Sequence, residues 1–328
     1  MRSALRLPAA VVAFACVAAV GCTTDDDGGD TTAAAVVTTT TVAPAAPASD
    51  DCRNLPPTAS YPPLVSLPAP NQMPTGSKLR EIQDRGKLTV GVSADTLLFG
   101  AQNPLTGVIE GFDIDMLNLV ASAIFGDDDD RLDIKVITYA QRIPSLQDRS
   151  VDLVAHTMTI NCTRWNQVGF SSTYYAAGQK ILVRRDSTKT SIADLDASGA
   201  EVCAPSGSTN IDELANYPGV KVRAVDDITD CLVLFQQGKV EAITADDTVL
   251  AGFADQDPYA VVVGDAFTQE PYGIAANAED VQLVQFVNKV LANARDDGRW
   301  KAIYERWLGA FGPTPEPPAA EAQLRPLP

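Results

Sequence analysis

The sequence predicts an α/β protein, in which helices cover the faces of β-sheets. From residue 78 onwards, short apolar runs of strand type alternate with longer stretches of helical spacing. That alternation is typical of α/β folds. Small polar or charged residues follow several of the apolar runs. Open α/β sheets bind ligands at the carboxyl ends of their strands, so these residues predict where a ligand site lies.

The first half of the folded body can be assigned in chain order from hydrophobic spacing and glycine positions. The expected elements are a helix at 78–86 that ends on its glycine, a strand at 88–92, an irregular polar stretch at 93–106, a turn and short strand at 107–112, a helix at 116–126, a strand at 132–137 and a helix that opens at Arg142.

The stretch VDLVAHTMTINCTR, residues 151–164, is the most informative part of the chain. Its apolar start predicts a buried strand over 151–155. Small polar residues follow, and the stretch closes on Arg164. A guanidinium donates two parallel, charge-assisted hydrogen bonds to a carboxylate, so this pattern predicts a carboxylate site. On this stretch alone, a surface arginine after a polar turn is an equal alternative.

Two later strands end in the same way. The strand at 201–203 runs into APSGSTN, residues 204–210, and then into a helix. Free amides at a helix start, with Ser208 and Thr209 beside them, suit an anion, although either side chain also suits a helix cap. The strand at 241–247 ends in two acids, Asp246 and Asp247.

The amino terminus predicts export. Residues 1–21 combine a short basic head with an apolar run that is too short to span a bilayer comfortably. Small residues stand directly before Cys22, which resembles a bacterial lipobox with alanine in place of the usual leucine. Lipidation of Cys22 would anchor the chain to the outer face of the cytoplasmic membrane. The alternative is an ordinary cleaved signal.

The chain between the signal and the body has the composition of a tether and an arm. Residues 22–50 have too little apolar surface to fold, and the proline-rich residues 51–77 predict an extended arm. The body follows over 78–312, which is long enough for two lobes of ordinary domain size. Residues 313–328 are rich in proline, alanine and glutamate, and we expect them to be disordered.

Four cysteines remain in the exported domain and predict two disulfides, for which three pairings exist. The preferred pairing joins Cys203 to Cys231 within one lobe. It also joins Cys52 to Cys162, which would staple the arm to the body. The chain has no CxxC spacing and a single histidine, His156, and both features argue against zinc.

The formal net charge of −17 argues against nucleic acid or anionic lipid as a partner, because either would repel such a surface. Asp127 to Asp130 is most simply a solvated turn, because it does not alternate acids as a calcium loop does. We therefore expect neither a metal nor a cofactor.

Five motifs, in this order, resemble the solute-binding proteins (family 3) of polar amino-acid ABC transporters: GKLTVGV, GVIEGFDIDM, RIPSLQDRSVDLVAHTMTINCTR, VGFSSTYY and GRWKAIYERWLG. The resemblance covers residues 86–309. The lipoprotein arm and the four cysteines are most similar to the actinobacterial GlnH-like lipoproteins that bind glutamate or glutamine.

The resemblance implies a periplasmic-binding-protein-like type II fold, in which two hinge strands join two α/β lobes around the ligand. Lobe one would comprise residues 78–176 and a return segment at 272–312, and lobe two residues 177–271. The hinge crossings would lie near 174–178 and 269–273. Closure would be a hinge motion that ligand contacts with both lobes favour.

The resemblance also implies ligand-binding residues. Arg164 would hold the ligand's α-carboxylate with help from Thr159 and, through its backbone, Thr157. Ser208 and Thr209 would contact a carboxylate from lobe two, and Asp246 would hold the α-ammonium.

Specificity rests on fewer residues. Arg142 resembles the arginine of receptors for acidic amino acids, and His156 would line the pocket, although a salt-bridged helix-start arginine and a structural histidine are the alternatives. Relatives carry an acid and an aromatic residue where this chain has Ser93 and Thr96. Asp95 or Phe99 would compensate for that departure.

The sequence therefore favours a monomeric, lipid-anchored receptor for a polar amino acid, namely glutamate, aspartate or their amides. Its membrane partner would be an ABC permease or, alternatively, a sensor protein that reports nutrient level. An enzyme on the same scaffold is the other alternative. The sequence shows no nucleophile–base set, metal cluster or convincingly spaced acid pair, so we expect no catalysis.

Overall fold

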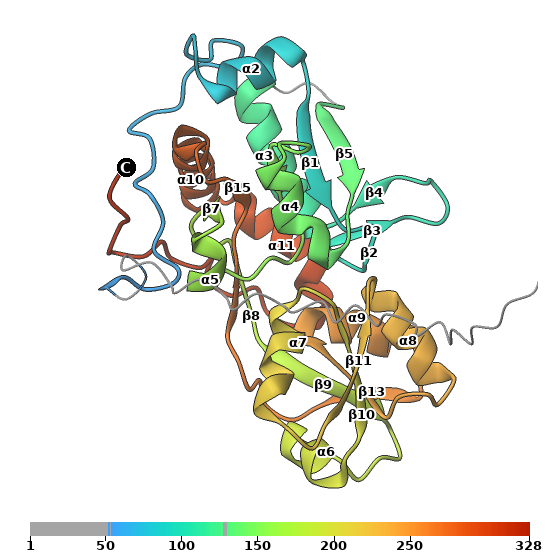
Figure 1. Ribbon diagram of the computed structural model, residues 1–328. Helices are drawn as coiled ribbons and strands as arrows, with labels where there is room; N and C mark the ends of the chain where they lie inside the picture. Colours follow the sequence, from blue (N-terminus) through green and yellow to red (C-terminus); the bar gives the residue numbers. More distant parts are fainter. Residues whose placement is uncertain (1–51, 53, 127–129) are drawn as a thin grey trace, which may run out of the picture. The chain divides into compact units, whose positions relative to one another are not determined.

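The computed structural model describes residues 52, 54–126 and 130–328. The signal, the tether and Cys22 lie outside the described residues, as do Asp127 to Asp129. Two five-stranded sheets organise the described chain (Figure 1). No helix in this part of the chain is long and apolar enough to cross a membrane.

The sheet of lobe one has the strand order β5-β1-β6-β15-β7. Its strands are β1 (Leu88–Val92), β5 (Leu132–Val136), β6 (Leu153–Val154), β7 (Val168–Phe170) and β15 (Ala275–Asn277). β1 pairs in parallel with β5 and β6, and β15 pairs antiparallel with β6 and β7. The carboxyl terminal part of the chain thus completes the sheet that the amino terminal part begins.

The sheet of lobe two has the order β11-β10-β12-β9-β13. Its strands are β9 (Gln179–Arg184), β10 (Glu201–Pro205), β11 (Lys221–Val225), β12 (Ala242–Asp246) and β13 (Ala260–Val263). β10 pairs in parallel with β11 and β12, whereas β9 runs antiparallel to β12 and β13.

Two short strands connect the lobes. β8 (Tyr175–Ala177) and β14 (Glu270–Tyr272) pair antiparallel and lie in the two stretches assigned above to the crossings. Figure 1 shows β8 passing between the two sheets. A small third sheet forms from β2 (Asp95–Thr96), β3 (Gly100–Gln102) and β4 (Ile109–Glu110).

The helices divide between the lobes. Lobe one carries α2 (Lys78–Arg85), α3 (Phe112–Phe125), η1 (Tyr139–Gln141), α4 (Arg142–Gln147), α5 (Cys162–Trp165), α10 (Val281–Asp296), α11 (Arg299–Leu308) and η3 (Gly309–Phe311). Lobe two carries α6 (Ile192–Ser198), α7 (Thr209–Glu213), η2 (Leu214–Asn216), α8 (Ile228–Gln236) and α9 (Asp247–Gln256).

The central strands of each sheet are buried on both faces, and their successive residues point to opposite sides. In β6, Leu153 packs into the core that α2, α3, α10 and α11 cover, and Val154 packs into the core beside α4 and α5. In β12, Ile243 faces α8 and α9 while Ala242 faces α6. The α/β prediction with two sheet-containing lobes is confirmed.

Several element bounds differ from the sequence prediction. The strand expected at 151–155 is limited to two residues of β6, and the stretch expected to be irregular, 93–106, contains β2 and β3. The helix expected at 116–126 begins four residues earlier, at Phe112, directly after Gly111. Gly111 has a φ of 146°, and a Cβ there would lie 2.2 Å from the carbonyl oxygen of Phe99. That close approach admits only glycine, and it lets the helix start early.

Both expected disulfides are present. Cys203 of β10 is joined to Cys231 of α8 within lobe two, and Cys52 of the arm is joined to Cys162 of α5, with Cα atoms 5.5 Å apart in each pair. The expected pairing is confirmed.

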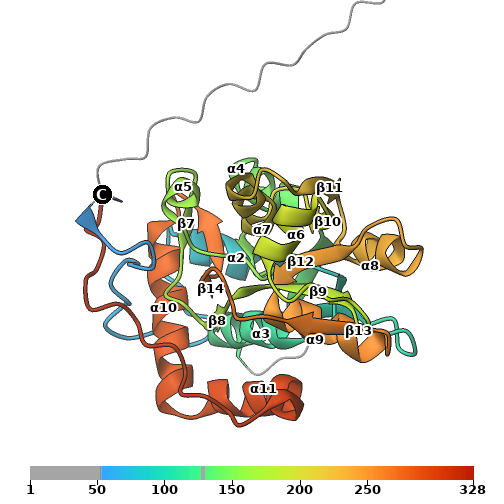
Figure 2. The same ribbon diagram turned by 90° about the horizontal axis from the view of Figure 1, so that it is seen from below.

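The tail differs from its expected disorder. Residues 313–328 contain no helix or strand, yet the tail lies beside the arm in both Figure 1 and Figure 2. Arg325 is 7% exposed, and its backbone N–H donates to the carbonyl of Ser60 at 2.9 Å. One buried side chain with backbone pairing orders a segment whose average composition predicts disorder.

Candidate functional site

The expected site residues gather at the junction of the two lobes. In lobe one, the chain leaves β6 and passes through Thr157 and Thr159 to α5, which carries Arg164. In lobe two, β10 leads through Gly207 into α7. A hydrogen bond between Arg164 and Gly207 crosses directly from one lobe to the other. The two polar strand-end segments therefore meet.

Arg164 is 6% exposed and is held by its own lobe and by the other one. Asn161 caps α5, with its Oδ1 accepting from the Arg164 N–H at 2.9 Å. The Arg164 Nη1 donates to the carbonyl of Thr159 at 2.7 Å and Nη2 to the carbonyl of Gly207 at 3.3 Å. Burial, together with the charge of Arg142, lowers the pKa of Arg164 to about 9, so the guanidinium stays charged at neutral pH.

Arg142 reaches the same lobe-two carbonyl. Its Nη2 donates to Gly207 at 3.0 Å, Nη1 to the carbonyl of His156 at 3.0 Å, and Nε to the carbonyl of Tyr139 at 3.0 Å. Its guanidinium also lies 4.7 Å from the centroid of the Tyr139 ring. Backbone carbonyls from both lobes therefore engage Arg142, and its lobe-two contact duplicates that of Arg164.

Gly207 makes this approach possible. Its φ is +75°, and a Cβ there would lie 2.8 Å from Cα of Ala140 in lobe one. That distance is a steric clash with backbone, which has little room to move. A side chain at this position would separate the lobes where the two guanidinium groups cross.

Glu270 connects both lobes through hydroxyl groups. Its Oε2 accepts from Thr159 Oγ1 of lobe one at 2.6 Å and from Thr209 Oγ1 of lobe two at 2.7 Å, and its Oε1 accepts from Thr268 Oγ1 at 2.5 Å. Glu270 is 3% exposed and belongs to the crossing strand β14. The sequence pattern does not identify Glu270, because it assigns residues 269–273 only to a crossing. The signal that could have identified Glu270 is an acid inside a crossing strand.

Asp246 ends β12 and is buried beside Glu270. Its Oδ1 accepts from Asn210 Nδ2 at 2.8 Å, and its Oδ2 accepts from the hydroxyl of Tyr272. Burial, and next the charge of Glu270, raise the pKa of Asp246 well above its usual range. Two carboxyl groups that destabilise each other's charge in this way would be stabilised by a cation between them.

His156 and Thr157 are buried in lobe one. His156 Nε2 lies 3.1 Å from the carbonyl of Ile137, and its ring meets the Tyr139 ring at a centroid distance of 4.6 Å. Burial and the charge of Arg142 lower the pKa of His156 to about 3, so it is neutral at pH 7. The Thr157 N–H donates to Asp113 Oδ2 at 2.8 Å, and the Thr157 hydroxyl has no hydrogen-bond partner among the described residues.

The Ser208 hydroxyl makes two hydrogen bonds at the start of α7. Its Oγ accepts from the N–H of Ile211 at 3.1 Å and donates to the carbonyl of Pro205 at 2.7 Å. This is the capping alternative, and Ser208 is the N-cap of α7. Thr209, one residue later, keeps its hydroxyl at the lobe junction.

Asp95 and Phe99 lie apart from this cluster. Asp95 Oδ2 accepts from the hydroxyl and N–H of Thr229 of lobe two at 3.0 and 3.3 Å, so it joins the lobes at the start of α8. Phe99 is completely buried against the rings of Phe112, Tyr175 and Tyr272. It therefore packs into the lobe-one core, which differs from the compensating ligand contact expected from the sequence.

Two cavities lie at residues of the lobe junction. One has a volume of about 240 Å³ and is lined by Arg142, Arg164 and Gly207. The other has a volume of about 560 Å³ and is lined by Thr159, Thr209 and Glu270, together with residues of the arm. The larger one lies within the range of about 300–1,000 Å³ that is typical of small-molecule sites.

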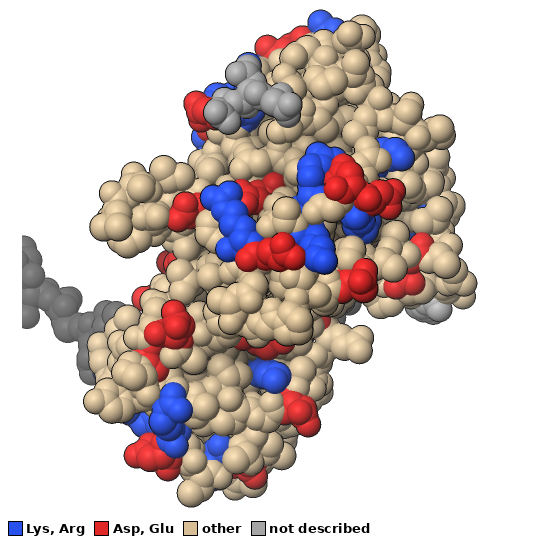
Figure 3. Space-filling view, turned by 180° about the vertical axis from the view of Figure 1, so that it is seen from behind, with Lys and Arg blue, Asp and Glu red and all other residues tan. Residues whose placement is uncertain are grey.

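Basic and acidic side chains are mixed on the outer surface that Figure 3 shows, whereas the charged groups at the junction are buried. On the face seen in Figure 3, basic and acidic side chains stand beside one another over both lobes. Within the described residues, no group of three or more His, Cys, Asp and Glu side chains is placed to hold a metal ion. The junction offers buried cations from lobe one, and buried acids from lobe two and the crossing strand, which suits a small molecule that carries both charges.

Two α/β lobes that are joined by two crossing strands and meet at a polar junction are the architecture expected of a solute-binding protein. The chain belongs to the bacterial extracellular solute-binding proteins, family 3, whose model matches residues 88–310. Its expected membership of that family is confirmed, and with it an extracytoplasmic location.

The comparisons with individual proteins agree. The chain is 38% identical to the ABC transporter glutamine-binding protein GlnH of Bacillus subtilis, over 70% of this chain and 84% of that protein. It is 30% identical to the glutamate-binding protein GluB of Corynebacterium efficiens, over 75% of this chain and 86% of that protein. It also matches the structure of an ancestral arginine-binding protein bound to glutamine, with a TM-score of 0.64, 33% identity, and coverage of 69% of this chain and 99% of that one.

We predict that His156 makes the fold sensitive to acid. The folded state keeps His156 neutral down to about pH 3, whereas the unfolded chain takes up the proton near the ordinary pKa of 6.5. The unfolded state then binds more protons, so stability falls as the pH falls through this window. His156→Gln should lose less stability than wild type between pH 6.5 and pH 4.5, by up to about 2.7 kcal/mol.

Urea unfolding at both pH values measures the difference. Asp113, whose pKa burial raises to about 6, acts in the opposite direction in the same window, and both proteins contain it. Equal pH slopes for the two proteins would show that His156 takes up its proton in the folded state as readily as in the unfolded chain.

Proposed function

We propose that this chain is a lipid-anchored receptor that binds a polar amino acid between its lobes for uptake by an ABC permease. Cys22 would carry the lipid. The observation that carries the proposal is the link that Thr159 makes between the two kinds of charge: its carbonyl accepts from Arg164 and its hydroxyl donates to Glu270, whose charge in turn acts on the buried Asp246. An α-amino acid presents one carboxylate and one ammonium, and this junction supplies a partner for each.

In this proposal Arg164 turns from the Gly207 carbonyl to the ligand's α-carboxylate. Thr159 would position both charges, because its carbonyl oxygen accepts from Arg164 and its hydroxyl donates to Glu270. Asp246 and Glu270 would share the α-ammonium. Glu270 thereby supplies the second anion that the serine at position 93 cannot supply. Thr209 would hold Glu270 from lobe two, so that the lobes close around the ligand.

The side-chain end of the ligand is expected to be an amide more readily than an acid. His156 is neutral at pH 7, and Arg142 already donates to the carbonyls of Tyr139, His156 and Gly207. The larger cavity is lined by Asp212, Glu213 and Glu270. A second ligand carboxylate would be repelled there, whereas an amide would not. The name of the glutamine-binding relative supports an amide, whereas that of the glutamate-binding relative supports the corresponding acid.

Two other functions remain as alternatives to be tested. A sensor role would need the same cleft and the same closure, and capture of a sensor ectodomain in place of a permease would favour it. Catalysis would require a reacting group aimed at the ligand. Incubation with each candidate amino acid, followed by product analysis, should return the ligand unchanged.

A thermal-shift screen of residues 47–328 against the common amino acids tests the function. A ligand that binds only the folded state raises the melting temperature as its concentration exceeds Kd. We expect clear shifts with glutamine, glutamate, asparagine or aspartate, and the largest with an amide. A shift with lysine or arginine alone would reject the proposed charge arrangement, and no shift at all would reject amino acids as ligands.

Arg164→Ala should weaken binding by roughly 2–5 kcal/mol, which is the scale for truncating one partner of a buried charge pair. Isothermal titration with the ligand found in the screen measures this loss. Arg299→Ala is the control, because Arg299 is an exposed arginine that pairs with Asp297. Arg164→Lys, which retains the charge without the planar fork, should fall between the two. Wild-type affinity in Arg164→Ala would place the carboxylate site elsewhere.

Glu270→Gln should weaken binding by about 1.5–3 kcal/mol, because the ammonium loses a charged acceptor while the amide oxygen can still accept from the threonines. In wild type, affinity should fall as the pH falls through the raised pKa of Asp246, because the protonated acid no longer attracts an ammonium. The variant should keep its affinity to lower pH, because the charge of Glu270 is gone. Exposed Glu279→Gln is the control. Superimposable pH profiles for wild type and Glu270→Gln would contradict this role.

A further inference from the structure

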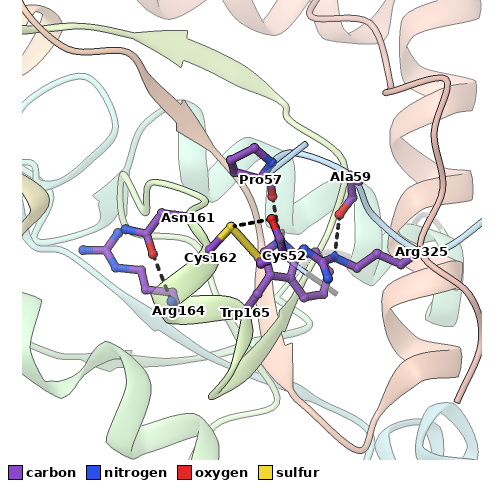
Figure 4. The surroundings of a disulfide bond; sticks show 8 residues. All are labelled: Cys52, Pro57, Ala59, Asn161, Cys162, Arg164, Trp165 and Arg325. Atoms are coloured by element: carbon purple, nitrogen blue, oxygen red, sulfur yellow. Dashed lines mark hydrogen bonds between the residues drawn. A yellow bond between two sulfur atoms is a disulfide. The ribbon is translucent and has the colours of Figure 1, made fainter. Parts of the chain in front are cut away.

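The helix that carries Arg164 cannot hold its own position. α5 has four residues, Cys162–Trp165, and so short a helix has little stability of its own. Figure 4 shows Arg164 on one side of it, and Cys162 and Trp165 on the other side, toward the arm and the tail. The orientation of Arg164 therefore depends on what holds the opposite side of α5.

The arm holds that side in two places. Cys162 is bonded to Cys52, and the indole Nε1 of Trp165 donates to the carbonyl of Pro57 at 2.8 Å. The Trp165 ring also packs edge-on against Tyr61, with centroids 5.8 Å apart. The disulfide at Cys52 and the hydrogen bond at Pro57 thus attach two points of the arm to the back of α5, the side opposite Arg164.

The tail closes over the same place. The Arg325 guanidinium lies 3.9 Å from the centroid of the Trp165 ring, which is the geometry of a cation–π contact. Its Nε donates to the carbonyl of Ala59 at 2.9 Å and its Nη2 to Cys52 Sγ at 3.4 Å. Thr58 also donates to Glu321 of the tail. Arg325 thereby contacts the arm, the disulfide and the helix at once (Figure 4).

We infer that Arg325 is a positioning residue for ligand binding, because it clamps the back of α5 and so fixes the guanidinium of Arg164 at the lobe junction. The inference rests on the proposed function of Arg164. Preorganised donors bind a carboxylate more tightly than mobile ones, because less freedom is lost on binding. The tail would then contribute to affinity although it lines neither of the two cavities at the junction.

The test compares Arg325→Ala with Arg306→Ala in the full chain. Arg306 is a matched control, because its guanidinium also lies over a tryptophan, 4.8 Å from the ring centroid of Trp307, but in α11. Arg325→Ala should weaken binding of the ligand found in the screen by about 2- to 30-fold, which is the range for residues that act through another group. Arg306→Ala should leave Kd unchanged. Unchanged Kd in Arg325→Ala, or an equal loss in both variants, would overturn the inference.

A double-mutant cycle separates positioning from general destabilisation. If Arg325 acts through Arg164, removing Arg325 should cost less affinity in an Arg164→Lys background than in wild type. Additive losses would overturn the inference. Deletion of residues 323–328 is a second way to remove the clamp and should reproduce Arg325→Ala, whereas Arg325→Lys should recover part of the affinity, because the cation remains over the ring.

Hydrogen exchange separates this inference from the proposed function. Without any ligand, the amides of residues 162–166 should exchange faster in Arg325→Ala than in wild type and in Arg306→Ala. If no amino acid binds wild type and the exchange still increases, the proposed function fails and the clamp on α5 stands. If exchange in α5 is unchanged, the clamp is rejected whatever the ligand.

Discussion

The carbonyl oxygen of Gly207 accepts hydrogen bonds from both Arg142 and Arg164, and the junction of the lobes depends on that contact. It requires a residue without a side chain, because a Cβ would meet the backbone of Ala140. It brings two buried guanidinium groups to the start of α7, where Thr209 stands. Because a carbonyl carries only a partial charge, a ligand carboxylate would satisfy Arg164 better, and the contact can be exchanged for a ligand.

The buried acids at the junction carry the charge opposite to that of the two arginines. Buried charges are costly unless they are paired and hydrogen-bonded. Glu270 meets that requirement with three threonine hydroxyls, and Asp246 with Asn210 and Tyr272. Burial, and next the charge of Glu270, raise the pKa of Asp246, and a ligand ammonium between the two acids would offset both effects. A zwitterion thus suits both sets of charges, which is a physical reason for closure on an amino acid.

The sequence predicts the parts of this site that follow from local pattern. Strands that end in polar residues identify Thr159, Arg164 and Asp246, because parallel strands bring their carboxyl ends to one edge of a sheet. It does not predict Glu270, whose role depends on the pairing of β14 with β8 across the hinge. It also does not predict the aromatic core around Phe99, because motif position does not reveal which rings pack against it. Composition also does not predict the packing of Arg325 in the tail, because it averages over individual residues.

The charged side chains at the junction belong to helices and strands that are too short to fix the positions of these side chains alone. Arg164 belongs to a helix of four residues, and Glu270 to a strand of three. Each is fixed from outside its own element, Glu270 by threonines of both lobes and Arg164 by the arm and the tail behind α5. If Arg164 binds the ligand as proposed, these external supports would supply the accuracy that short elements lack, and the arm and the tail would then contribute to binding together with the cleft.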